Sequence, residues 1–255
     1  MNKIKVVDEK TFIENQNSAI KYKDNVIEVN ENTDIYIEYS SISDIKKNIK
    51  FIVNSNSTLN LISFKSGNNI NIKTQIELFD NASVNHCIFN NCQNISEDLT
   101  VNLNSENTKY NLSLKTLSKN KEYYNINLNH LAEKTVSNLS NSAVNIENGE
   151  IVFNINGMIE KGKIKSVMNQ NNRIVNLTKN KCVINPNLYI EEYDVVANHS
   201  GIIGKFRDDE LFYLQTRGID KLFATKLLIS GVLLKGVKNE YLKEKIISVI
   251  NQNWR

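Results

Sequence analysis

Glycine and proline are scarce in this chain, with nine and one among its 255 residues. A β-sandwich usually marks its hairpin turns with these two residues, so their scarcity disfavours a fold built from tight hairpins. Cysteine is also rare. The three cysteines, Cys87, Cys92 and Cys182, are odd in number, and their spacing matches neither a disulfide framework nor a metal-binding motif.

Long hydrophobic runs are missing as well. No stretch reaches the roughly 18–20 apolar residues that cross a bilayer, and the start of the chain lacks the apolar run of a signal peptide. Its 31 basic and 28 acidic residues are interspersed, which gives no electrostatic case for nucleic acid or a membrane surface. We therefore expect a cytoplasmic protein, or one of an organellar stroma or matrix in a eukaryotic source.

Alternation of apolar and polar residues dominates the chain from about Val26 to Ile190. It is clear in 34–39, 70–78 and 151–156, where period two places the apolar side chains on one buried face. Asparagine is abundant, which is typical of an AT-rich genome, and it tolerates the left-handed backbone of tight corners. Strands joined by short polar corners favour a solenoid. No clean repeat emerges, so a β-sandwich remains the alternative.

Helical spacing replaces alternation near the C-terminus. An acidic start at Asp208 and Asp209 precedes a helix that Gly218 ends, and Asp220 caps a second helix over 221–229. A third helix is predicted over 239–251. Three short helices bury little core alone, so they should pack on the β body or on a partner.

The domain boundary is expected between a β core, residues 1–205, and a helical domain, residues 206–255. Before Val26 the pattern is weak. The segment 9–15 fits either a short helical turn or an edge strand, and it defines no separate domain.

No catalytic motif is present, and the carboxylates fall on strand positions that are expected to face solvent. His86, Cys87 and Cys92 invite a metal-site interpretation. Residues 85–89 read as a strand, however, so His86 and Cys87 should point to opposite faces, which makes a metal site improbable. His130 ends an alternating run and is interpreted as an ordinary surface or turn histidine.

His199 lies in the segment 195–204, thirteen positions after the only proline, and by itself it fits a hydrogen-bonded residue at a strand end. The run from Pro186 through Asn198-His-Ser-Gly201 to Glu210-Leu-Phe-Tyr-Leu-Gln-Thr-Arg-Gly-Ile219 resembles the C-terminal signature of the SufB/SufD family. The likeness is strongest over residues 184–231 and extends weakly back to Phe153. These proteins are scaffold components of the SUF machinery, which assembles iron–sulfur clusters.

The resemblance implies an all-β fold, a right-handed parallel β-helix followed by a small C-terminal helical domain. It also implies that the helical tail binds SufC, an ATPase of the ABC type, and that two scaffold subunits associate through their β cores. The residues that we expect to contact the ATPase are Phe212, Tyr213, Arg217, Gly218, Leu227 and Leu228.

Two positions favour the SufD branch. The resemblance implies that SufB-type chains carry a glutamate directly after the histidine, where this chain has Ser200. It also implies an upstream cysteine in those chains near the position of Asn171, where this chain has none. Cys182 is not a convincing substitute. SufD-type chains keep the histidine, so His199 is the candidate ligand in an assembly site at the subunit interface. The resemblance also implies an N-terminal helical region before the β core of typical members, and we expect little of it ahead of Val26.

We therefore expect a non-catalytic scaffold subunit with no tightly bound cofactor of its own, on which an iron–sulfur cluster is held transiently in the complex. The sister subunit would be a SufB-like chain or an identical copy, and neither nucleic acid nor membrane insertion is expected. The alternatives are a secreted β-helical carbohydrate-active enzyme, which needs acidic groups converging on an outer groove, and a structural solenoid repeat protein.

Overall fold

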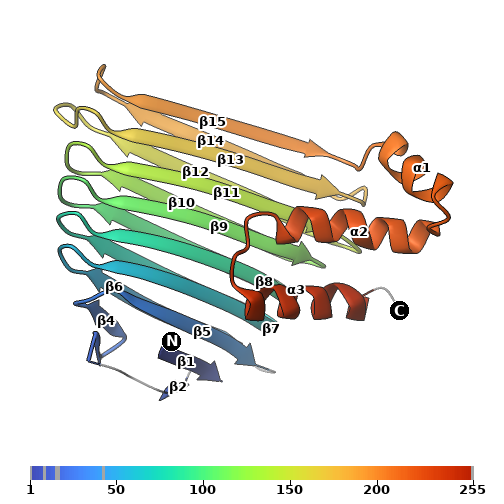
Figure 1. The fold of residues 1–255 in the computed structure, drawn as a ribbon, viewed down its shortest axis with the longest axis horizontal. Helices are drawn as coiled ribbons and strands as arrows, with labels where there is room; N and C mark the ends of the chain where they lie inside the picture. The colour runs from blue at the N-terminus through green and yellow to red at the C-terminus, as the bar shows by residue number, and fades with distance from the viewer. Residues whose placement is uncertain (1, 8–9, 15–17, 42–43, 254–255) are drawn as a thin grey trace.

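The computed structural model describes residues 2–7, 10–14, 18–41 and 44–253. Most of them form a stack of parallel strands, and three helices follow near the C-terminus (Figure 1). The predicted all-β solenoid with a helical tail is thus confirmed, and the β-sandwich alternative is wrong. Each turn of the chain contributes one strand to each of two facing sheets. We call each such turn a rung.

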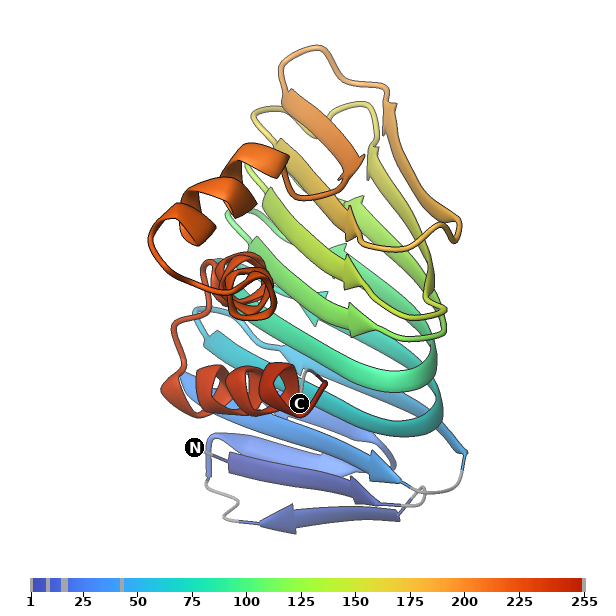
Figure 2. The same cartoon turned by 90° about the vertical axis from the view of Figure 1, so that its right-hand side faces the viewer.

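One sheet is covered by helices on its outer face, and we call it the helix-covered sheet (Figure 2). Its separate strands are β1 (Asn2–Val7), β5 (Thr33–Ser41), β9 (Lys109–Ser118), β11 (Val136–Asn145), β13 (Val167–Asn176) and β15 (Val196–Gly204). The facing sheet, which we call the open sheet, contains β4 (Val26–Val29), β6 (Ile45–Val53), β10 (Lys121–His130), β12 (Glu150–Ile159) and β14 (Cys182–Ile190).

Two long strands, β7 (Thr58–Leu78) and β8 (Ser83–Leu103), pair in both sheets. At the N-terminal end, β2 (Lys10–Glu14) pairs antiparallel with β1, and β3 (Ile20–Lys23) pairs antiparallel with β4. The segment around β2 is therefore an edge strand, as one of the two sequence interpretations had it.

The strand register reveals the repeat that the sequence hides. Thr58 pairs with Ser83, 25 residues later, whereas Val136 pairs with Val167, 31 residues later. Because the corners differ in length, residues that share a column do not recur at a fixed spacing. Four asparagines hold left-handed corner conformations, as their tolerance for positive φ predicts: Asn25, Asn56, Asn81 and Asn107.

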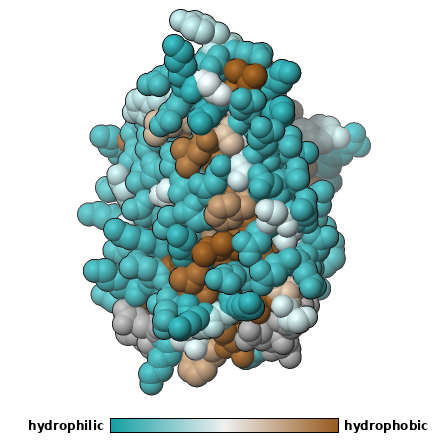
Figure 3. Space-filling view, turned by 90° about the vertical axis from the view of Figure 1, so that its left-hand side faces the viewer, coloured by the Kyte–Doolittle hydropathy of each residue, from teal (hydrophilic) through white to brown (hydrophobic). Residues whose placement is uncertain are grey.

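The main hydrophobic core fills the space between the two sheets. It is formed by the inward positions of the alternating strands, such as Leu61, Ile76, Val101 and Ile126, each at most 1% exposed. The side of the solenoid that carries the 54–57, 79–82 and 191–195 turns is mainly hydrophilic, with a narrow hydrophobic strip (Figure 3). No helix among the described residues is long and apolar enough to span a membrane.

The helices are α1 (Asp208–Thr216), α2 (Lys221–Leu234) and α3 (Glu240–Asn253). Asp220 caps α2 through a hydrogen bond from the Phe223 backbone N–H to its Oδ1, at 3.0 Å. A second hydrophobic cluster joins α2 and α3 to the outer face of the helix-covered sheet. In it, Ile229 and Ile246 pack with Tyr36 and Phe89. The tail therefore does pack on the β body.

Candidate functional site

His199 lies on β15 in a column of inward-facing side chains. The register places Leu61, His86, Leu112, Leu139, Gln170 and His199 in successive rungs of this column. Among the described strands, β15 pairs only with β13 and β14 pairs only with β12, so no rung covers the last one. His199 is therefore exposed although it points toward the interior of the solenoid.

A backbone carbonyl orients the His199 ring. The Nδ1 atom lies 3.0 Å from the Pro186 oxygen on β14. A carbonyl oxygen only accepts hydrogen bonds, so Nδ1 carries a proton and donates it. In the neutral ring this leaves the Nε2 lone pair free. A histidine held through one nitrogen by a carbonyl is the usual arrangement of a metal-ligating imidazole.

The position of Pro186 follows from where β14 lies in the open sheet. Proline cannot donate to a strand ladder, so it is confined to edge strands and bulges. As the last strand of the open sheet, β14 has a free edge, and the only proline of the chain fits there.

An outer groove of about 510 Å³ runs along the helix-covered sheet beside His199. Ser200 and Asn171 line it as register partners, and the Ser200 hydroxyl donates to Asn171 Oδ1. Ser200 and Asn171 thus lie side by side. They offer only a hydroxyl and an amide, which are weak ligands for iron.

The described residues contain no group of three or more histidine, cysteine, aspartate or glutamate side chains that could hold a metal. Within the described chain, His199 therefore stands at the open end of the stack without belonging to such a group. Any iron or iron–sulfur group that it binds needs its other ligands from elsewhere.

The three cysteines do not come together with His199. Cys87 lies on the outer face of β8 near the α2–α3 connection, and burial raises its pKa to about 11. Cys92 is buried, and burial raises its pKa further. Cys182 is half-buried at the start of β14, with its sulfur 3.2 Å from Asn145 Nδ2. His86 faces inward and Cys87 outward, as their alternation predicts.

The predicted partner-contacting residues cluster on α1 and α2. Phe212 and Tyr213 are 67% and 58% exposed, and Leu227 is 41% exposed. Arg217 is also exposed, and its guanidinium lies 5.4 Å from the Tyr213 ring. No described residue of α1 is fully buried. Leu211 and Leu214 are half-buried, and Phe212 and Tyr213 are its exposed apolar side chains.

Four other residues of the tail bear on this surface. Leu222 and Phe223 on α2 are 48% and 53% exposed, and the sequence prediction missed them. Leu228 instead packs, half-buried, against the cluster beneath the tail. Gly218 ends α1 with a φ of 81°, a left-handed conformation that suits glycine. We call Phe212, Tyr213, Leu222, Phe223 and Leu227 the tail patch.

Two sequence interpretations of polar residues are wrong. His130 is fully buried rather than at the surface, with ring nitrogens 2.6 Å from Thr135 Oγ1 and 2.8 Å from Ser137 Oγ, and burial lowers its pKa to about 4. Glu97 and Glu122 are buried between the sheets, whereas the sequence pattern predicts that carboxylates on the strands face solvent.

These carboxylates belong to an internal polar network. Lys65 Nζ lies 2.6 Å from Glu97 Oε1 across the two sheets. Glu122 accepts hydrogen bonds from Thr116 Oγ1 and Tyr124 OH, each at 2.8 Å, and burial raises its pKa to about 7. Alternation shows that these positions face inward but not that their charges find partners there.

The structure is thus a parallel β-solenoid with an uncovered last rung and a partly exposed helical tail. Residues 12–232 match the family model described as SUF system FeS cluster assembly, SufBD core domain. The chain belongs to this family, as its resemblance indicated.

Relatives support the SufD branch. The chain is 26% identical over 252 residues to the iron-sulfur cluster assembly protein SufD of Bacillus subtilis, an alignment that covers 95% of this chain and 54% of that protein. Over 70 residues it is 31% identical to Escherichia coli SufD, covering 26% of this chain and 16% of that one. It thus spans about half the length of the Bacillus subtilis protein and matches a smaller share of the Escherichia coli one.

Proposed function

We propose that this chain is a non-catalytic scaffold subunit of a SUF-type iron–sulfur cluster assembly complex. The observation that carries the proposal is His199, a single oriented imidazole at the uncovered end of the solenoid. One ligand is too few to hold a cluster, so the arrangement makes chemical sense when a partner supplies the remaining ligands. The cluster is then the cargo of the complex.

The sister subunit docks on the last rung. The free edges of β14 and β15 carry backbone N–H and C=O groups that another strand can pair with. A SufB/SufD-type chain added there covers His199 and brings its own side chains to the site. Pairing at this edge predicts slowed hydrogen exchange of the β14 and β15 amides when the sister chain is added.

The tail patch docks an ABC-type ATPase similar to SufC. Its five side chains are exposed, whereas other side chains of α2, together with those of α3, pack against the helix-covered sheet. An apolar patch of this kind, bordered by charged residues, usually marks a protein interface. ATP hydrolysis belongs to that partner, and we expect the purified chain alone to hydrolyse none.

Co-elution with a SufC-type ATPase tests the proposal. Phe212→Ala should weaken the complex by about tenfold or more, as expected for an exposed aromatic anchor. Phe212 has no role in the core, so the variant should keep its fold. Ile247→Ala removes an exposed apolar side chain of α3 outside the patch and should leave binding unchanged. Two folded proteins that do not co-elute under reducing conditions would refute the docking.

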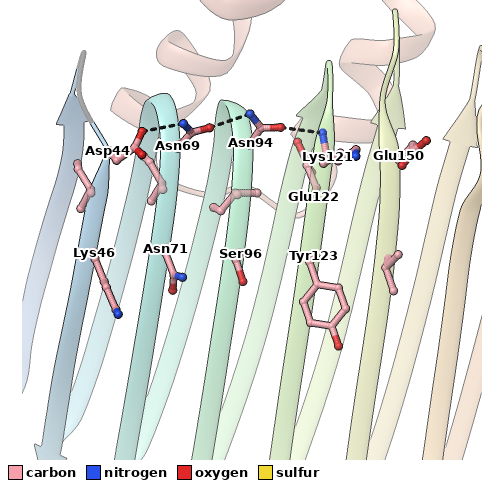
Figure 4. A pocket seen from close by; sticks show the side chains of 14 residues that line it. Asp44, Lys46, Asn69, Asn71, Asn94, Ser96, Lys121, Glu122, Tyr123 and Glu150 are labelled. Carbon is pink, nitrogen blue, oxygen red and sulfur yellow. Dashed lines mark hydrogen bonds between the residues drawn. The ribbon is translucent and has the colours of Figure 1, made fainter.

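The carbohydrate-active alternative has a candidate groove, of about 730 Å³, on the outer face of the open sheet (Figure 4). Asp44 and Glu150 lie at its two ends, and β7, β8 and β10 separate their strands. Four inter-strand steps place them about 19 Å apart, whereas a glycosidase pair is roughly 5–10 Å apart. Asp44 and Glu150 are therefore too far apart to act as a glycosidase pair. Glu122, the third carboxylate that lines the groove, is buried and hydrogen-bonded to Thr116 and Tyr124.

A further inference from the structure

Asparagine side chains form hydrogen-bonded ladders along the outer faces of the solenoid. In the longest ladder, each Nδ2 donates to the Oδ1 of the residue one rung nearer the N-terminus, at 2.7–3.1 Å. Its members are Asp34, Asn60, Asn85, Asn111, Asn138, Asn169 and Asn198.

The carboxyl group of Asp34 sets the direction of this ladder. Its Oδ1 accepts from Asn60, which turns its Nδ2 toward it, and every amide above points the same way. A second ladder has the same polarity, because Asn69 donates to Asp44 and Asn94 donates to Asn69 (Figure 4).

The two ladders end differently. In the second, the backbone N–H of Lys121 donates to Asn94 Oδ1 at 3.3 Å and satisfies the last acceptor (Figure 4). The first ends at Asn198 on β15, and no donor among the described residues reaches the Oδ1 atom of this exposed side chain.

The asparagine ladders of the open sheet end in the same way on the last rung. Asn185 donates to Asn154 Oδ1 at 2.8 Å, and Asn187 donates to Asn156 Oδ1 at 3.0 Å. Each therefore turns its own Oδ1 toward the free edge of β14. The last rung presents three side-chain acceptors, from Asn185, Asn187 and Asn198, in one direction.

We propose that the last rung selects a sister solenoid chain that presents hydrogen-bond donors to Asn185, Asn187 and Asn198, and that it disfavours a second copy of this chain. The inference rests on the proposed edge-to-edge docking. Two identical last rungs bring acceptors toward acceptors. An amide that rotates to donate across the interface gives up its bond to the rung beneath. Lysine, arginine or amides of opposite polarity on the partner satisfy the acceptors directly.

Asn198→Lys provides the test, because an ammonium group can donate to Asn169 and also across the interface. We expect wild-type chain alone and N198K alone to remain largely monomeric in sedimentation velocity. An equimolar mixture should associate at least about tenfold more tightly than either alone, as expected for one charge-assisted hydrogen bond. Gln252→Lys adds the same charge at an exposed position of α3 and should leave the mixture like the wild type.

Two outcomes overturn the inference. One is a mixture that associates no more tightly than wild type alone. The other is wild-type self-association of equal strength, with slowed hydrogen exchange over residues 196–204. Either outcome leaves the proposed scaffold function standing, with a second copy as a permitted sister subunit. Failure to bind the ATPase, by contrast, counts against the proposed function and not against the polarity of the last rung.

Discussion

His86 and His199 occupy the same inward-facing column of the helix-covered sheet, four rungs apart. His86 is buried, and its two ring nitrogens contact Ser63 Oγ at 3.1 Å and Tyr110 OH at 3.0 Å. Burial holds its pKa well below the ordinary range of histidine. His199 is exposed, and only Nδ1 has a described partner. The same residue type is structural where the next rung covers it and available for binding where none does.

The comparison extends to the other polar groups of the interior. In the covered rungs, lysine and glutamate are paired or hydrogen-bonded between the sheets. On the last rung, the inward positions are partly buried, as at Cys182, or exposed, as at His199. Covered positions should therefore respond to mutation through stability and uncovered ones through binding.

Breaking the buried ion pair should produce the largest loss of stability. Lys65→Met leaves Glu97 without its partner in the interior, and we expect the free energy of unfolding to fall by about 3–5 kcal/mol. Urea unfolding followed by circular dichroism measures this change. The double variant Lys65→Met with Glu97→Gln should recover most of the loss. A single variant as stable as wild type would show that the pair does not form.

Glu122 should make stability depend on pH. Its folded pKa, about 7, exceeds that of the unfolded chain, so its contribution is complete at low pH and is lost as the pH rises from about 4.5 to 7. The full change corresponds to about 3 kcal/mol. Glu122→Gln should flatten this part of the stability profile in urea titrations at several pH values. An unchanged slope would assign the pH dependence to other groups.

Substitutions of the two histidines should differ in how much they lower the free energy of unfolding, measured in the same assay. His86→Ala leaves a cavity and two unpaired hydroxyls, and we expect a loss of about 2 kcal/mol. His199→Ala should cost less than about 0.5 kcal/mol, because its ring is exposed. Equal losses from the two substitutions would contradict the distinction between covered and uncovered rungs.

The smallest expected effect concerns the asparagine ladder. Asn111→Ala removes two ladder hydrogen bonds on an exposed face and should cost about 1 kcal/mol. Asn198→Ala removes one such bond and should cost about half as much. Chemical denaturation of both variants beside wild type provides the measurement. A larger loss at the end of the ladder than in its middle would argue against rung-by-rung bonding.

The sequence predicts the strands and helices well because their periodicities differ. Alternation over 34–39 and 151–156 marks buried faces, and Asp220 marks the start of α2. The repeat length escapes prediction because corners of different length shift the spacing of paired residues. The asparagine ladders cannot be predicted for the same reason, because only the strand register shows that Asn111 pairs with Asn138.

The site is less predictable than the fold. The family resemblance points to His199 as a candidate ligand. Its contact with Pro186, thirteen residues earlier in the chain, depends on how β14 and β15 fold back on each other, which the sequence does not show. The Lys65–Glu97 pair crosses between the sheets, so alternation alone interprets both as ordinary charged residues. The tail patch was found in part, because helical spacing does not tell whether Leu227 or Leu228 faces the sheet.

Cluster formation in a reconstituted complex tests the central claim most directly. Wild-type or His199→Ala chain would be combined with the ATPase and a sister scaffold chain, then supplied with iron, sulfide and reductant, and the bound cluster measured by its visible absorption. We predict that His199→Ala keeps its fold and both partners but loses most of the cluster. A variant complex that accumulates as much cluster as wild type would show that the open rung does not use this imidazole as a ligand.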